Sequence, residues 1–182
     1  RYGSKNLLGE KLTVCAAVTV PGEGCVLACD SRVTAGLGVL TDTCDKFVVA
    51  GRAVALVAGS DGALMDVIAG AKNIEGLRML ASEYSDGRQL SWELLCYCRR
   101  SERLVWLDNS GMALPLGDFH ATGSGGELAL GVLSSASKPT TLERAAKLVR
   151  KACQVAIKHN AACGGKVRVL VVRGKRAPVE IT

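Results

Sequence analysis

The order of the hydrophobic segments is the feature that most restricts how this chain can fold. Runs of short segments rich in β-branched and small apolar residues alternate with pairs of segments whose apolar residues recur at helical spacing. A doubly wound parallel sheet would have single helices between its strands, so paired helices favour stacked antiparallel sheets with helices outside them. The order therefore predicts an α+β domain. The predicted strands are 13–20, 24–30, 41–49, 53–58, 92–98, 104–107, 112–116, 119–122, 167–172 and 178–181, and the predicted helices are about 61–68, 74–84, 126–135 and 142–159.

Local signals mark the ends of several of these segments. Pro21–Gly24 is a turn between the first two strands, and the second strand ends in an acidic residue, Asp30. Ser60 is suited to cap the first helix. The last helix has the clearest helical pattern, and either Thr140 or Thr141 can cap it. These signals predict a first hairpin and a long last helix with defined ends.

Composition is ordinary for one globular domain with a real core. The chain has 182 residues, of which 48% are hydrophobic and 22% are charged. No apolar run is long enough to cross a membrane, and residues 1–12 lack the apolar stretch of a signal peptide. Because the chain does not begin with Met, we expect that residues upstream of Arg1 were removed or are missing.

The cysteines and the charge exclude two further classes of site. The eight cysteines form no C-x-x-C pair, so we expect no zinc site, and no other cofactor is indicated. Scattered thiols in apolar runs suit a reducing compartment, either a cytoplasm or a mitochondrial matrix. The net charge is +6, but the basic residues are dispersed and no aromatic residues are interleaved with them. We therefore do not expect nucleic-acid binding.

Three polar residues stand out at strand positions near the start of the chain. Thr13 opens the first strand, Asp30 ends the second, and Lys46 lies in the third predicted strand. Each has an ordinary explanation, since Thr is a good strand former, Asp often caps a turn and most Lys side chains are exposed. Taken together they are the residue types that activate a hydroxyl nucleophile.

Four motifs give these residues a context. They are Asp30–Gly36 (DSRVTAG), Ala58–Ser60 (AGS), Ala121–Gly126 (ATGSGG) and Asn160–Gly165 (NAACGG). In this order and spacing the chain resembles the β-subunits of the proteasome and the bacterial HslV peptidase, from Thr13 to about residue 174. Its start, Thr-Val-Cys, is also similar to the Anbu proteins. The resemblance implies the four-layer α-β-β-α sandwich of the N-terminal nucleophile hydrolases.

The resemblance also implies a threonine peptidase mechanism. Thr13 would be the nucleophile, and its own α-amine, once freed by cleavage of the preceding bond, would be the general base. Lys46 would favour the neutral amine by charge repulsion, and Asp30 would orient Lys46. The Gly59 N–H would bind the oxyanion, and Ser124 would hydrogen-bond near the amine. No metal is needed in this mechanism.

The remaining implied roles concern support of the site, the substrate and assembly. Residues that support the amine or contact the peptide are expected from the same motifs and strands. The protein would form a homo- or hetero-oligomeric ring, with an ATPase unfoldase as a possible partner. The supporting residues are Asn160 and Cys163, Thr34 would pair with the substrate backbone, and the pocket before the cut would be lined by Val33, Cys44, Val48 and Val57.

Several departures from the family pattern leave two readings open. Leu12, rather than Gly, precedes Thr13, so residues 1–12 form an extension before a domain at 13–182. Asn160 replaces a frequent Asp, Cys163 replaces a Ser, and the helices between 61 and 90 are short. With the extension attached, the amine is locked in an amide and we expect no activity. The chain is therefore either a peptidase activated by cleavage or a non-catalytic subunit of a larger assembly.

Overall fold

In a computed structural model, the structure describes residues 12–35, 38–59, 63–88 and 90–181. These residues form two five-stranded sheets, a two-stranded sheet and four helices, a mixed α and β architecture that agrees with the predicted class. The strands are β1 (Cys15–Val20), β2 (Gly24–Asp30), β3 (Val33–Ala35), β4 (Gly38–Thr41), β5 (Phe47–Ala50), β6 (Ala53–Gly59), β7 (Trp92–Cys98), β8 (Arg103–Asp108), β9 (Ala113–Pro115), β10 (Phe119–Thr122), β11 (Val167–Val172) and β12 (Val179–Ile181); the helices are α1 (Ala63–Ile68), α2 (Ile74–Ser85), α3 (Gly126–Ser135) and α4 (Leu142–His159).

The two large sheets differ in how the chain builds them. The first sheet has the order β10-β1-β2-β11-β12, so strands from both ends of the sequence meet in it. The second is a meander in chain order, β5-β6-β7-β8-β9. All the strand pairs are antiparallel. Because β10 and β11 flank the hairpin of β1 and β2, segments around residues 122 and 165 are brought to the ends of the first hairpin.

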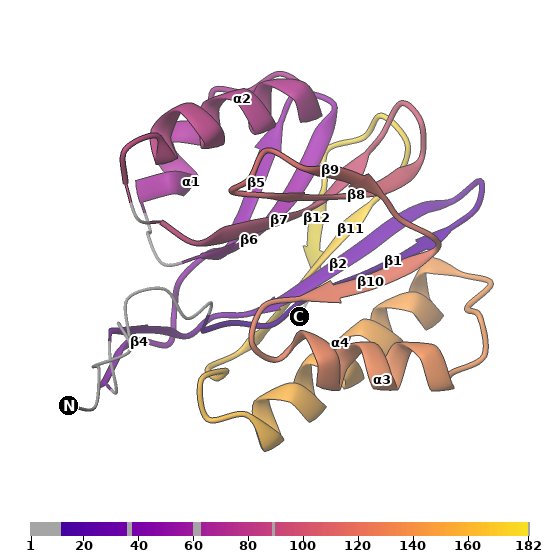
Figure 1. Ribbon diagram of the computed structural model, residues 1–182. Helices are drawn as coiled ribbons and strands as arrows, with labels where there is room; N and C mark the ends of the chain where they lie inside the picture. The colour runs from indigo at the N-terminus through magenta and orange to yellow at the C-terminus, as the bar shows by residue number, and fades with distance from the viewer. Residues whose placement is uncertain (1–11, 36–37, 60–62, 89, 182) are drawn as a thin grey trace.

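Alternate residues of β1 and β2 belong to two different cores. Ala16 and Val18 pack with apolar residues of α3 and α4, whereas Ala17 and Leu27 pack with residues of the other sheet. A third core lies between the second sheet and helices α1 and α2. Figure 1 shows the two helix pairs on opposite sides of the sheets. Burial on both faces explains why β1 and β2 are apolar without alternation, and each large side chain buried there contributes about 1.5–3 kcal/mol.

Helix α4 forms for the reasons visible in its sequence. The Thr141 side chain accepts a hydrogen bond from the Arg144 amide, 3.3 Å away, so Thr141 is the cap. Glu143 lies in the first turn and Lys158 in the last, as the helix dipole favours. The apolar face of α4 covers β1, β2 and β11. The helix ends at His159, so Asn160 begins the segment that leads to β11.

The prediction of one strand over 41–49 was wrong. Strand β4 ends at Thr41, residues 42–46 have no strand pairing, and β5 begins at Phe47. The sequence pattern also did not predict the β3–β4 hairpin. Residues 42–46 instead bind the segment after β2: the Ser31 hydroxyl donates to the Asp42 carbonyl, and the Cys44 amide donates to the Ser31 carbonyl. Lys46 therefore lies in a loop, just before β5.

The proposed helix cap at Ser60 lies outside the described residues. Within the described ranges, no helix combines the length and the apolar character that a membrane crossing requires.

Candidate functional site

Thr13 lies two residues before the start of β1 and is almost completely buried, with 3% of its surface exposed. Its hydroxyl contacts two charged groups: it donates to the Asp30 carboxylate and accepts from the Lys46 ammonium. Lys46 Nζ is 2.7 Å from Asp30 Oδ1. The three residues singled out in the sequence are thus in mutual contact around one hydroxyl oxygen.

Asp30 is the centre of this group and is fully buried. Its Oδ1 accepts hydrogen bonds from Lys46 and from the Val14 amide at 3.2 Å. Its Oδ2 accepts from the Gly164 amide at 2.9 Å. A carboxylate that accepts hydrogen bonds on both oxygens and is paired with an ammonium is held in a fixed position.

Lys46 is held in place although it is not in a strand. Its carbonyl accepts a hydrogen bond from the Val57 amide, 3.0 Å away, which ties the loop to β6. The Lys46 side chain is only 8% exposed, and its ammonium contacts Thr13 and Asp30. Removal of either partner of such a buried pair leaves an uncompensated charge, which costs about 3–5 kcal/mol.

A turn at residues 122–125, called here the Ser124 turn, holds the main chain of Thr13. The Thr13 amide donates to Ser124 Oγ at 3.2 Å, and Ser124 Oγ is 3.3 Å from the Thr13 carbonyl oxygen. The Gly125 amide donates to the same carbonyl at 3.1 Å. Gly123 has φ +87°, and a Cβ there would overlap the Thr13 carbonyl, so only glycine allows this approach.

Asn160 and Cys163 support Ser124 rather than touching Thr13. Asn160 Nδ2 donates to the Ser124 carbonyl at 2.8 Å, and Cys163 Sγ is 3.8 Å from Ser124 Oγ. Burial, reinforced by the charge of Asp30, raises the pKa of the Cys163 thiol to about 11. Cys163 is therefore a neutral thiol at physiological pH.

Three residues on the other side of the site, Arg32, Asp42 and Gly164, were given no role in the predictions from sequence. Arg32 pairs with Asp42 through Nε at 2.8 Å and Nη2 at 3.2 Å, and its Nη1 is 3.4 Å from the Cys163 carbonyl. The guanidinium lies where a Cβ on Gly164 would be. This pair holds the turn at residues 160–166, called here the Gly164 turn, whose amide reaches Asp30. Arg32 lies within the DSRVTAG motif, which was the available signal.

The residues expected to meet the oxyanion and the substrate are divided between two environments. Gly59 ends β6 opposite Trp92, two residues after Val57, whose amide binds the Lys46 carbonyl. Val48 and Val57 are each 5% exposed and belong to the core beneath α1. Val33, Thr34 and Cys44 are partly exposed, and the buried Thr34 Oγ1 has no hydrogen-bond partner among the described residues.

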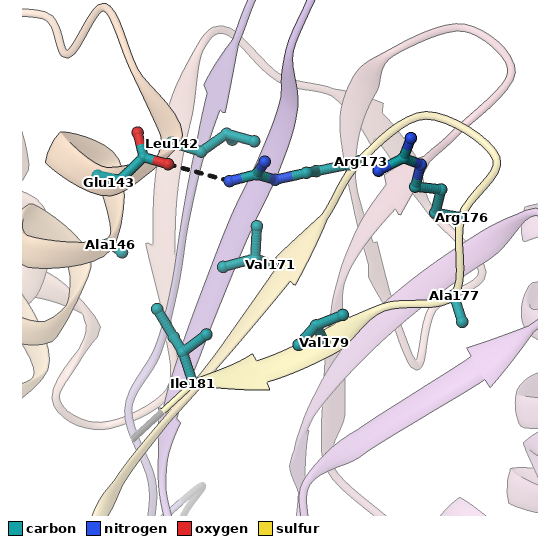
Figure 2. Close-up of a pocket in the computed structure, with 9 residues that line it drawn as sticks. All are labelled: Leu142, Glu143, Ala146, Val171, Arg173, Arg176, Ala177, Val179 and Ile181. Carbon is teal, nitrogen blue, oxygen red and sulfur yellow. Dashed lines mark hydrogen bonds and ion pairs between the residues drawn. The ribbon is translucent and has the colours of Figure 1, made fainter.

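A cavity on another part of the surface does not include these residues. It has a volume of about 360 Å³ and lies between α4 and the strands β11 and β12 (Figure 2). Val171, Val179 and Ile181 line it, and the ion pair of Glu143 with Arg173, 3.0 Å apart, closes one side. Within the described ranges, no cluster of three or more His, Cys, Asp or Glu side chains could hold a metal ion.

The groups around Thr13 act separately on its hydroxyl and on its nitrogen. An ammonium and a carboxylate polarise one buried hydroxyl, while separate groups hold the adjacent nitrogen. With Leu12 attached, that nitrogen is an amide. Its N–H donates a hydrogen bond to Ser124, and the nitrogen cannot accept a proton. If the Leu12–Thr13 bond were cleaved, this nitrogen would become an amine on the same residue as the polarised hydroxyl.

Comparison with known proteins identifies the family from a different part of the chain. A family model described as a proteasome subunit matches residues 77–172, which are more than half of the chain. This segment contains Ser124, Asn160 and Cys163, whereas Thr13 and Asp30 precede it. No curated protein matches the chain in sequence. On the strength of the family match, this chain belongs to the proteasome subunit family.

Proposed function

We propose that this chain is a threonine peptidase of the proteasome type, activated by cleavage before Thr13. The observation that carries the proposal is the buried Thr13 hydroxyl between Lys46 and Asp30, with the Thr13 nitrogen at Ser124. Members of the family form ring-shaped oligomers, and many of them are threonine peptidases. The contacts of this hydroxyl with an ammonium and a carboxylate support the proposal, because the chemistry needs an activated hydroxyl.

Activation would be an N-to-O acyl shift followed by hydrolysis. Thr13 Oγ1 attacks the Leu12 carbonyl carbon, and its proton passes to the Thr13 nitrogen as the C–N bond breaks. Water then hydrolyses the ester, which releases residues up to Leu12 as an acid and restores the Thr13 hydroxyl beside the amine that the shift has freed. Water is the only other reactant that the two steps need.

Peptide hydrolysis would use the same atoms in the same places. The freed amine takes the proton of Oγ1 as this oxygen attacks the substrate carbonyl, and it returns the proton to the leaving nitrogen as the C–N bond breaks. Water then hydrolyses the ester on Oγ1, which releases the acid product and restores the hydroxyl. The Lys46 ammonium stabilises the developing charge on Oγ1 and favours the neutral amine. The Gly59 amide is proposed to bind the oxyanion. Thr34 would hydrogen-bond the substrate, and a pocket formed there by the expected Val side chains would favour cleavage after apolar residues.

The family membership supports finer proposals about the fold and the assembly. We propose that the two helix pairs and two sheets form the four-layer α-β-β-α sandwich of N-terminal nucleophile hydrolases, with residues 1–12 as the removable extension of a domain at 13–182. The chain would assemble into a ring of the HslV or Anbu kind, inside a cell, and receive unfolded polypeptide from an ATPase. Helix pairs on two faces offer the surfaces for such stacking.

One observation favours a second candidate, a non-catalytic subunit of a larger assembly. The Thr13 nitrogen is bonded to Leu12 and donates its proton to Ser124, so in this form the site has no general base. In this reading the extension remains attached, and the contacts of Asp30 and Lys46 only stabilise the domain.

Intact mass and N-terminal sequencing of the assembled protein separate the two candidates. The peptidase is expected to yield a chain that begins at Thr13 and cleaves peptides with apolar side chains, and Thr13→Ala should show neither processing nor turnover. An unprocessed wild-type chain without turnover would contradict the peptidase and support the structural subunit. A processed chain without Thr13-dependent turnover would also contradict the peptidase.

A further inference from the structure

Glu93 is an acidic residue in an otherwise uncharged strand. Strand β7 reads WELLCYC, and Glu93 is its second residue. In the second sheet it lies opposite Ala58 on β6 and opposite Asp108 on β8. Ala58 precedes Gly59, so Glu93 lies beside the strand end that is proposed to bind the oxyanion.

The Glu93 side chain reaches across to the first sheet. Its Oε2 accepts a hydrogen bond from the Thr122 hydroxyl, and the Gly123 amide is 3.4 Å from the same oxygen. Thr122 is the last residue of β10 and is 6% exposed. One carboxylate oxygen thus joins the two sheets at the residue where the Ser124 turn begins.

The Ser124 turn is held at two points. Glu93 binds its first residues, and Asn160 binds the Ser124 carbonyl. Between these points, Ser124 and Gly125 contact the nitrogen and the carbonyl oxygen of Thr13. A displacement at Thr122 would therefore move the groups that orient the Thr13 nitrogen.

We propose that Glu93 is a positioning residue, which holds the Ser124 turn against Thr13 and fixes its distance from the end of β6. The proposal rests on the proposed function for its effect on catalysis. Glu93 acts through Thr122 and Gly123 as a hydrogen-bond acceptor and does not touch the reacting atoms. Burial lowers the pKa of the neighbouring His120, so this imidazole is neutral at physiological pH. His120 is therefore not a positively charged partner for Glu93.

Variants of Glu93 separate acceptor geometry from charge. Glu93→Gln keeps an oxygen that can accept from Thr122, whereas Glu93→Leu removes the acceptor. For Thr13-dependent hydrolysis, measured per mature N-terminus, we expect kcat to fall about 10- to 100-fold in Glu93→Leu, because a small misplacement of a catalytic group has effects of this size. KM should change less than about threefold, and Glu93→Gln should retain most of kcat.

Asp108 offers a matched control. It lies opposite Glu93 on the next strand, and its Oδ1 also holds a turn, by accepting from the Ser110 amide at 3.0 Å and the Met112 amide at 3.1 Å. Asp108→Ala should leave kcat unchanged. Thr122→Val removes the donor instead of the acceptor, and it should lower kcat in the same direction as Glu93→Leu even if the Leu variant folds poorly.

Amide hydrogen exchange tests the inference without activity. In Glu93→Leu, the Gly125 amide, which binds the Thr13 carbonyl, should exchange at least about tenfold faster, while the Gly164 amide, which binds Asp30, should be unaffected. Unchanged exchange at Gly125, or an equal loss of kcat in Glu93→Gln and Glu93→Leu, would overturn the inference. A wild-type chain without Thr13-dependent turnover would contradict the proposed function alone, and the exchange result would still decide on Glu93.

Discussion

The Ser124 turn and the Gly164 turn approach Thr13 from two sides and act on different parts of it. The Ser124 turn contacts the nitrogen and the carbonyl oxygen of Thr13 directly. The Gly164 turn contributes an amide to the far oxygen of Asp30, 2.9 Å away, and reaches the Thr13 hydroxyl only through that carboxylate.

This difference shows that the hydroxyl and the nitrogen of Thr13, the two atoms that the proposed chemistry uses, are held in different ways. The position of the nitrogen depends on backbone shape, because Gly123 lies so close to the Thr13 main chain that a side chain at position 123 would overlap it. The state of the hydroxyl depends on charge, because Lys46 and Asp30 are buried together beside it. Steric changes should therefore affect the nitrogen side most, and charge changes the hydroxyl side.

The largest expected effect comes from Lys46→Ala. It should abolish processing and turnover and lower the free energy of unfolding by about 3–5 kcal/mol, because Asp30 is left charged and unpaired in the interior. Chemical denaturation and a peptidase assay measure both losses. The matched control is Lys138→Ala, since Lys138 pairs with Asp118 at 2.5 Å but is 58% exposed, and its loss should cost less than about 1 kcal/mol.

A double variant sharpens this prediction. Asp30→Asn combined with Lys46→Met removes both charges, so it should recover much of the stability lost in Lys46→Ala while remaining inactive. If Lys46→Ala were as stable as Lys138→Ala, the charge account of the hydroxyl side would be wrong.

An intermediate effect is expected from alanine substitutions of the two turn glycines. Gly123→Ala places a Cβ against the Thr13 backbone at φ +87°, which should cost about 1–3 kcal/mol and most of the activity. The atoms nearest to a Cβ in Gly164→Ala belong to the Arg32 side chain, which can move away at the cost of its pairing with the partly exposed Asp42. We expect a loss below about 1 kcal/mol there. Thermal unfolding and kcat should rank the two variants in this order, and the reverse order would contradict the comparison.

The smallest expected effect comes from Cys163→Ser. Cys163 belongs to the Gly164 turn but contacts Ser124 at 3.8 Å, so it links the two sides. A hydroxyl is a stronger hydrogen-bond partner than a thiol, and one such bond is worth about 0.5–1.5 kcal/mol, so kcat should change by no more than about tenfold. A larger change in kcat would mean that Cys163 acts on Thr13 by another route.

The Cys163 thiol also gives a pH dependence of known sign. Its pKa is raised from 9.0 to about 11 in the folded chain, so the unfolded chain loses this proton first as the pH rises. The contribution of the neutral thiol to stability is therefore lost between about pH 9 and pH 11. Denaturation at pH 8 and pH 10.5 should show a smaller loss for Cys163→Ser than for the wild type. Equal losses would show that the thiol is not protected.

The predictable parts of the fold are those determined by local pattern. Strands β1 and β2 and helix α4 were predicted within one or two residues, since their apolar residues and Thr141 are sufficient signals. The loop at 42–46 was not predicted because its hydrogen bonds come from Ser31, eleven residues before Asp42.

The site shows the same limit. The family resemblance pointed to Thr13, Asp30 and Lys46, which lie in contact in the structure. It did not point to the Gly164 amide or to Glu93, because their roles depend on backbone and strand placement across distant segments. A lone acidic residue in an apolar strand was the available signal for Glu93.

The buried thiols can be used to measure whether the chain is folded. Among the described cysteines, six are buried and two, Cys44 and Cys98, are partly accessible. Burial raises the pKa of Cys15, Cys25 and Cys153, so these thiols resist alkylation as long as the sheets and helices stay closed. The number of alkyl groups added in a short pulse of reagent would therefore show when the interior is open during assembly. No label has to be introduced for this measurement.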